Sequence, residues 1–301
     1  AFVWALSRTV EGWARSVGMP TSRLRGVGSG APGLIDVPRG VVHHLVNVPG
    51  WRNVPLARRL TERLGCPCVV DNDVNLVALG EWSLGAGRGA HHLVCLTLGT
   101  GVGGGLVLGG RLYRGASGSA GEIGHMVVEP GGRRCACGSR GCLETLVGSA
   151  AIVRAARAAL LHGARTLRRL TRQAHGPLTP EVVYQAAAAG DRAAQRIWSE
   201  VGCWLGVGIA NLVNLLNPDR VVIGGGVAGA WRFLAPAMQR TVRAQAMAVP
   251  GRAIRIVHGQ LGDKAGVIGA AVLVWSHEAE TDRAKRPPQS PGGSAKGLVE
   301  T

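Results

Sequence analysis

The chain has 301 residues, of which 46% are hydrophobic and 17% charged, and it carries a formal net charge of +16. This composition is typical of a folded protein with a sizeable core, and the length allows two domains. No run of 18 apolar residues is free of glycine and charge, which argues against a membrane-spanning helix. The N-terminal stretch lacks the pattern of a secretory signal peptide, so we expect a cytoplasmic protein.

Arginine supplies nearly all of the basic charge, because lysine occurs at only three positions. The stretch between Glu144 and Glu181 contains six arginines and no acidic residue. Such a stripe either meets phosphate groups or forms a solvated helix face, and the solvated face is the favoured interpretation. An arginine-rich nucleic-acid binder without enzymatic activity is therefore kept only as an alternative.

The first half of the chain alternates between short apolar runs and segments of helical periodicity. Pro55 marks a helix start, since its fixed φ suits the first turn and its missing N–H costs nothing there. In chain order the sequence predicts strand 24–30, helix 56–64, strand 68–70, helix 75–84, strands 92–98 and 105–108, and helix 150–161.

The second half has the strongest periodicity, with apolar residues recurring at helical spacing from Ile197 to Leu216. The sequence predicts helix 193–216, strand 220–223, helix 230–244, strand 253–258 and helix 264–275. From His277 onward the composition turns to charge, proline, serine and glycine, which predicts a disordered tail over 277–301. The alternation as a whole indicates the α/β class.

Two glycine clusters match the G-x-G-x-x-G spacing, at 99–104 and 224–229. The first leads into another strand, and the second lacks a downstream acidic residue for a ribose, so neither fits a dinucleotide-binding fold. A glycine hairpin that carries Thr100 suits another task, because its backbone N–H groups can approach terminal phosphates closely. The later turn is suited to lie against a base or a ribose.

Polar residues mark the point where the strand at 68–70 meets the following helix, in the order Asp71, Asn72, Asp73 and Asn75. One such residue is enough to cap the helix N-terminus. A carboxylate at a strand end is also well placed to take a proton from a substrate hydroxyl. We predict Asp73 as that base, with Asn72 as its hydrogen-bonding neighbour.

Four potential metal ligands occur close together: His125, Cys135, Cys137 and Cys142. Three thiolates and one imidazole are a usual structural zinc set, and four protein ligands leave no open position for a substrate. Gly138 and Gly141 are expected to supply the turns between the cysteines. The alternative is a loop with unmetallated cysteines. The other four cysteines are scattered in apolar surroundings, as is typical of buried free thiols.

The stretch GEIGH…CACGSRGCLE, together with VVDNDVN…LGEW, TLGTGVGGG and VVIGGGV, resembles the ROK family of bacterial sugar kinases and sugar-responsive repressors, in particular its glucokinases. The resemblance implies a two-domain, actin-like (ribonuclease H-like) ATPase fold with a structural zinc loop. It divides the chain into a small domain over 1–75, completed by a helix at 264–276, and a large domain over 76–263.

The resemblance also implies roles for individual residues. Asp73 matches the base that activates the sugar 6-hydroxyl, and Asn72, Glu122 and Glu144 match groups that bind sugar hydroxyls. His125 matches a residue that binds zinc through one ring nitrogen and faces the sugar with the other. The nucleotide is expected at two turns, with phosphate at Thr100 and Gly101 and adenosine at Gly225 and Gly226.

The implied function is an ATP-dependent hexose kinase that uses Mg²⁺ and a structural Zn²⁺, with a homodimer as the common assembly. The alternative is a repressor of the same family with a DNA-binding domain ahead of this chain. The family's opening D-x-G-G-T motif has no match here, so we expect the first strands of the small domain to be missing. We therefore expect little kinase activity from this chain alone.

Overall fold

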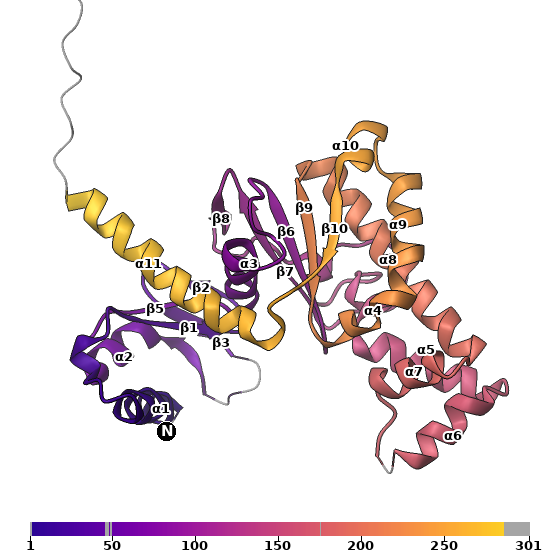
Figure 1. The fold of residues 1–301 in the computed structure, drawn as a ribbon, viewed down its shortest axis with the longest axis horizontal. Coiled ribbons are helices and arrows are strands. Elements are labelled where there is room, and N and C mark those ends of the chain that lie inside the picture. The colour runs from indigo at the N-terminus through magenta and orange to yellow at the C-terminus, as the bar shows by residue number, and fades with distance from the viewer. Residues whose placement is uncertain (1, 46–47, 49, 175, 286–301) are drawn as a thin grey trace, which may run out of the picture.

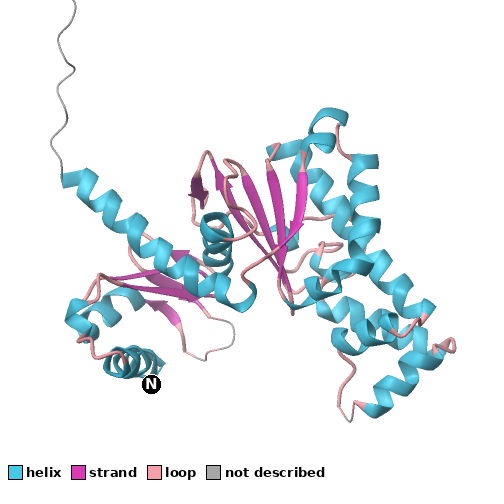
Figure 2. Cartoon of the chain, in the orientation of Figure 1, coloured by secondary structure: helices cyan, strands magenta, loops and turns pink. Residues whose placement is uncertain are grey.

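The computed structural model describes residues 2–45, 48, 50–174 and 176–285, and its strands form three sheets (Figure 1). The largest has the order β10-β9-β6-β7-β8, a second pairs β1 with β5, and a third has the order β2-β3-β4. The predicted α/β class is confirmed, with helices packed around the strands (Figure 2).

The five-stranded sheet consists of β6 (Leu93–Leu98), β7 (Val102–Leu108), β8 (Arg111–Tyr113), β9 (Arg220–Gly224) and β10 (Arg255–His258). Strand β9 runs parallel to β6 and β10, whereas β7 and β8 are antiparallel to their neighbours. Alternate residues of β6 enter different cores, since Leu93 and Cys95 join one buried cluster and Val94 and Leu96 the other. The sheet is therefore covered on both faces.

One face is covered by the helices that follow β8 in sequence. They are α4 (Glu144–Val147), α5 (Ser149–Leu161), α6 (Arg165–Gln173), α7 (Pro180–Ala188), α8 (Arg192–Leu216), α9 (Trp231–Gln245) and α10 (Ala248–Ala253). Helix α8 begins where the Asp191 carboxylate accepts the backbone N–H groups of Ala193 and Ala194. It ends at Asn217, whose φ of 44° places it in the left-handed region.

Helix α8 is long and apolar enough, by composition, to cross a membrane, but half of its most apolar window is buried inside the protein. It packs against α9, α5 and α7 and supplies much of the main core, as the buried helix of a folded domain does. The arginines of α6 lie at i, i+3, i+4 and i+7 and are exposed, in agreement with a solvated face: Arg165, Arg168, Arg169 and Arg172.

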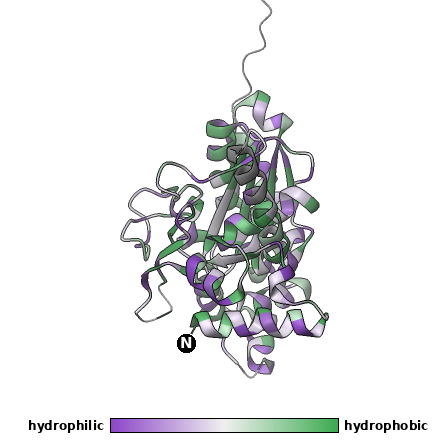
Figure 3. Ribbon diagram, turned by 90° about the vertical axis from the view of Figure 1, so that its left-hand side faces the viewer, coloured by the Kyte–Doolittle hydropathy of each residue, from purple (hydrophilic) through white to green (hydrophobic). Residues whose placement is uncertain are grey.

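The N-terminal part has its own core. Its elements are α1 (Phe2–Ser16), β1 (Val27–Ala31), β2 (Ile35–Asp36), β3 (Val41–His44), β4 (Arg52–Val54), α2 (Leu56–Leu64) and β5 (Cys68–Asn72). Helix α2 buries Leu56, Leu60 and Leu64 in this core. Helix α1 mixes hydrophobic and hydrophilic residues along its length (Figure 3) and packs its apolar side on the same core. The sheet β2-β3-β4 was not predicted, because two- to four-residue strands carry too little alternation.

Cys66 and Cys68 are buried in this core as free thiols, as predicted, and Cys95 is buried in β6. The prediction is wrong for Cys203, which is exposed on α8. Burial raises the pKa of Cys68 to about 11, so this thiol stays protonated and unreactive near neutral pH.

Helices α3 (Asp73–Leu84) and α11 (Ala265–Lys285) cross at very close range. A Cβ added at Gly80 would collide with the carbonyl of Ala265, and one at Gly269 with the carbonyl of Leu76. A Cβ at Gly28 of β1 would likewise collide with the backbone of Ala270. Glycine at these positions lets α11 reach back from the large sheet and lie on β1 and α3.

The predicted C-terminal helix is confirmed, but its predicted end is wrong. Helix α11 continues through nine residues, 277–285, that were assigned to a disordered tail. This segment is rich in alanine, glutamate, arginine and lysine, which favour helix, and its first proline comes only at Pro287. The rest of the predicted tail, 286–301, lies outside the described residues. The short 3₁₀ helices are η1 (Thr21–Arg23), η2 (Ile123–His125), η3 (Gly226–Ala230) and η4 (Gly262–Lys264).

The helix crossing predicts opposite effects for two alanine substitutions in α11. Gly269→Ala should lower the free energy of unfolding by about 1–3 kcal/mol, because the added methyl meets rigid backbone. Gly266→Ala should not lower it, since the nearest atom to an added Cβ is 3.9 Å away and alanine favours helix. Urea unfolding measures both, and equal stability of the two variants would contradict the proposed close contact.

Candidate functional site

The N-terminus of α3 is fixed by the side chain of Asn72, which accepts the backbone N–H groups of Val74 at 2.9 Å and Asn75 at 3.3 Å. Its Nδ2 donates to the carbonyl of Gly33 at 3.2 Å, across to the turn before β2. Asp73, the predicted base, is exposed at the first position of the helix. The cap therefore belongs to Asn72, which leaves the Asp73 carboxylate on the surface.

Strand β7 carries three consecutive glycines that let other segments approach from both sides. A Cβ at Gly103 would lie 2.5 Å from the side chain of Val74, and one at Gly105 would lie 2.6 Å from Ala78, so α3 lies on this face. On the opposite face, a Cβ at Gly104 would collide with the carbonyl of Gly121 and with Ile123. The strand thus brings the start of α3 and the turn containing η2 close to each other.

A pocket lies between these segments. Its lining includes Asn72, Val74 and Asn75 from the start of α3, and Ser119 and Glu122 from the turn before η2. Glycines of β7 and of the turn before β2 complete the wall. Of the predicted sugar-binding residues, the structure places Asn72 and Glu122 in this lining, and Asp73 lies between two lining residues in sequence.

His125 and Glu144 lie beside this pocket rather than in its lining. The Nε2 atom of His125 is 3.9 Å from the carboxylate of Glu122, which lines the pocket. The imidazole therefore lies directly behind this lining residue. The Oε2 atom of Glu144 accepts the backbone N–H of Val102 at 3.0 Å and lies against Gly101. In this structure Glu144 therefore braces the first glycine turn.

The two predicted nucleotide turns lie next to each other. Strands β6 and β9 are parallel neighbours, with Thr97 paired to Gly224, so the turns follow the carboxyl ends of adjacent strands. Gly225 has a φ of +85°, and a Cβ there would collide with the carbonyl of Leu98. Ligands of α/β proteins bind at this edge of a parallel sheet. The geometry thus brings Thr100, Gly101, Gly225 and Gly226 to one edge.

A second pocket adjoins the Gly225–Gly226 turn, between α7, α8 and η3. Its lining includes Glu181, Tyr184, Gly226 and Gly229. Neither Glu181 nor Tyr184 was predicted as a site residue, since both belong to a helix with no motif of its own. Only the packing of α7 against η3 reveals them.

The four predicted metal ligands converge, with their ligand atoms all within 4.8 Å of one another. The Sγ atoms of Cys137 and Cys142 are 3.6 Å apart, and the Sγ of Cys135 is 3.6 Å from Nδ1 of His125. A tetrahedral zinc ion with ordinary bond lengths needs about 3.8 Å between two sulfurs and about 3.6 Å between sulfur and nitrogen. The donor set therefore fits such an ion.

The turns around this cluster need glycine, as predicted. Gly138 and Gly141 have φ values of +97° and +73°, and a Cβ at Gly141 would collide with the carbonyl of Glu129. Burial and the neighbouring thiols raise the pKa of Cys142 to about 11, whereas the Ser139 backbone lowers that of Cys137. A bound cation would favour the thiolate form of all three cysteines.

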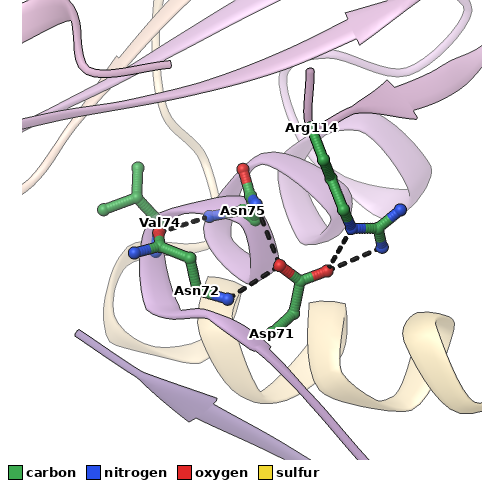
Figure 4. A network of polar contacts seen from close by, with 5 residues as sticks. All are labelled: Asp71, Asn72, Val74, Asn75 and Arg114. Carbon is green, nitrogen blue, oxygen red and sulfur yellow. Dashed lines mark hydrogen bonds and ion pairs between the residues drawn. The ribbon is translucent and has the colours of Figure 1, made fainter. Parts of the chain in front are cut away.

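Sequence reasoning missed the most extensive polar network near the pocket, which centres on Asp71 (Figure 4). The Asp71 carboxylate is buried and accepts hydrogen bonds from Asn75 and from Arg114, 43 residues away in sequence. No local pattern links Arg114 to Asp71. The one available signal was an acidic residue at the end of a buried strand.

Comparison with known proteins identifies the family. The ROK family model matches residues 5–277. The chain belongs to the ROK family. It is 42% identical over 282 residues to a glucokinase of Halalkalibacterium halodurans, covering 93% of this chain and 83% of that protein.

Among solved ROK structures, a ROK family glucokinase from Streptomyces griseus in complex with glucose and AMPPNP superposes with a TM-score of 0.78. Its sequence is 35% identical, and the match covers 91% of this chain and 87% of that one. The DNA-binding transcriptional repressor Mlc of Escherichia coli is 32% identical, over 83% of this chain and 61% of the repressor. Both branches of the ROK family are therefore similar to this chain, and the glucokinase is matched over more of its length.

The glycine strand predicts that Gly104→Ala lowers the free energy of unfolding by about 1–3 kcal/mol, because its methyl group meets the turn before η2. Gly99→Ala is the matched control, since no atom lies within 4 Å of an added Cβ there. Thermal unfolding followed by circular dichroism compares the two variants. A Gly104→Ala protein as stable as the Gly99→Ala protein would contradict the close approach.

Proposed function

We propose that this ROK protein is an ATP-dependent hexose kinase that transfers the γ-phosphoryl group of ATP to the 6-hydroxyl of glucose or a related hexose. One observation carries the proposal: Asn72 and Glu122, from segments 50 residues apart, line one pocket beside the exposed Asp73. The similarity to glucokinases over most of their length supports the same function.

In the proposed reaction Asp73 accepts the proton of the sugar 6-hydroxyl as the phosphoryl group is transferred. Its carboxylate is exposed, and the Val74 N–H that its Oδ1 accepts is also accepted by Asn72, so the helix N-terminus does not depend on Asp73. Asn72, Glu122, His125 and Glu144 bind or border the sugar and fix its orientation. Positioning supplies most of the acceleration in phosphoryl transfer, since the protein contributes little covalent chemistry.

We assign the ATP phosphates to Thr100 and Gly101 and the adenosine to the turn at Gly225 and Gly226. The adjacency of the two turns at the ends of β6 and β9 supports this assignment. Mg²⁺, when bound with ATP, would neutralise charge on the transferred phosphoryl group. The pocket lined by Glu181 and Tyr184 then lies on the adenosine side.

We propose that His125, Cys135, Cys137 and Cys142 hold a structural Zn²⁺. Four protein ligands would leave the ion without an open position, so its contribution is to fix the loops that present His125, Glu122 and Glu144. Rigid polar groups are needed there, because a buried donor left unpaired by the wrong sugar costs about 1–3 kcal/mol.

Further expectations rest on the family resemblance. They are a small domain of residues 1–75 with 264–276, a large domain of residues 76–263 and a homodimer. The cytoplasmic location stays an expectation from the N-terminal sequence pattern. A sugar-responsive repressor is the second candidate function, favoured by the similarity to Mlc. It predicts hexose binding without phosphoryl transfer.

The proposed base gives a direct test. Asp73→Asn should lower kcat about 10²- to 10⁴-fold, because the amide cannot accept the hydroxyl proton, while hexose binding changes little. A coupled assay of ADP release over a panel of hexoses measures kcat and KM, with Glu62→Gln on the exposed face of α2 as control. Normal turnover by Asp73→Asn would refute the assignment. Because little activity is expected from this chain alone, hexose binding without turnover favours the repressor only if it persists after a D-x-G-G-T segment is added at the N-terminus.

The proposed zinc site predicts metal content as well as stability. The purified protein should contain about one equivalent of zinc, and Cys142→Ser should lose it and lower the melting temperature, because one of four ligands is gone. Cys203→Ser removes an exposed cysteine outside the cluster and should keep the metal. Elemental analysis measures the zinc content, and thermal unfolding measures the melting temperature. A zinc-free, stable protein would contradict the proposal.

A further inference from the structure

The carboxylate of Asp71 forms the densest polar contact beside the pocket, and the family-derived roles do not include it. Its side chain is 1% exposed and accepts four hydrogen bonds. Two come from Arg114, through Nε at 2.8 Å and a terminal nitrogen at 2.6 Å, and both reach the same oxygen, Oδ2, in a charge-assisted contact. The others come from the backbone N–H of Asn72 at 2.7 Å and from Asn75 Nδ2 at 2.9 Å.

Asp71, one partner of the Asp71–Arg114 ion pair, belongs to one wall of the pocket. Asp71 pairs with Gly30 of β1 near the end of β5, directly before the turn into α3. Two of its hydrogen-bond donors, Asn72 and Asn75, line the pocket themselves. Any shift of the carboxylate therefore reaches the pocket through groups that are bonded to it (Figure 4).

Arg114, the other partner, belongs to the opposite wall of the pocket. Arg114 follows β8, and its carbonyl accepts the backbone N–H of Ala120 at 2.9 Å, which closes the intervening loop. Gly118, Ser119, Ala120 and Gly121 of this loop line the pocket, as does Glu122, which follows them. A Cβ at Gly118 would lie 2.9 Å from the carbonyl of Ile35, so the loop also packs against β2.

We propose that Arg114 and Asp71 form a positioning pair that sets the distance between the two walls of the sugar pocket; this rests on the proposed function. Neither residue lines the pocket, so the pair acts through Asn72, Asn75 and the loop over 115–121. Removing the guanidinium leaves a buried carboxylate without its cation, which the protein relieves by moving one wall. A displacement of about 1 Å in an active site can cost about 100-fold in rate.

Kinetics of Arg114 variants test the proposal. Arg114→Gln should raise the KM for hexose at least about tenfold and lower kcat, because both the sugar contacts and the base are displaced. The KM for ATP should stay within about twofold, since the nucleotide turns belong to other strands. Arg114→Lys keeps the positive charge but loses one of the two donors to Asp71. Its KM for hexose should therefore lie between those of the unaltered protein and Arg114→Gln. Arg111→Gln, on the exposed start of β8, is the matched control and should behave as the unaltered protein.

Hydrogen exchange tests the same pair without any ligand or activity. Amide exchange over 115–122 and 72–75 should quicken in Arg114→Gln and Asp71→Asn, and no further in the double variant, because each single change already breaks the pair. Quickened exchange in a protein that neither binds nor phosphorylates a hexose would support the pair while refuting the proposed function. A lower melting temperature with unchanged hexose KM, or exchange that quickens no more here than elsewhere, would overturn the proposal.

Discussion

The site depends on one packing constraint: the start of β7 has almost no side chains. Gly103 and Gly105 admit α3 on one face, and Gly104 admits the turn before η2 on the other. When a helix or a loop packs on a strand with ordinary side chains, those side chains keep its backbone away from the strand backbone. Here both come into close contact with the same strand, so Asn72, Val74 and Asn75 can line a single pocket with residues 118–122.

Helix α3 transmits that constraint to the rest of the molecule. Its first turn lines the pocket, its middle packs on β7, and its outer side is crossed by α11 at Gly80 and Gly269. At its far end the buried Glu81 carboxylate accepts backbone N–H groups of Ala86, Gln260 and Leu261. These bonds tie the segment that leaves β10 for α11 to the same helix. The N-terminal core and the large sheet therefore meet through one rigid element.

The polar groups around the pocket have separate tasks. Asn72 satisfies the helix N-terminus, Asp71 holds Arg114, and Glu144 supports the first glycine turn. Asp73 is exposed at the helix start, where its Oδ1 also accepts the backbone N–H of Val74 at 3.0 Å. The Cys–His cluster includes His125 of η2, whose Nε2 atom is 3.9 Å from the Glu122 carboxylate at the pocket.

The sequence by itself determined the features that arise from neighbouring residues. Helix periodicity located α8, Pro55 marked the start of α2, and the spacing of three cysteines and a histidine located the metal-type cluster, because these patterns are local. Only the tertiary structure decided that Arg114 meets Asp71, that Glu144 braces a turn, and that Glu181 and Tyr184 adjoin Gly226. These contacts join residues far apart in the chain, so they depend on how strands and helices pack, and no stretch of sequence records that packing.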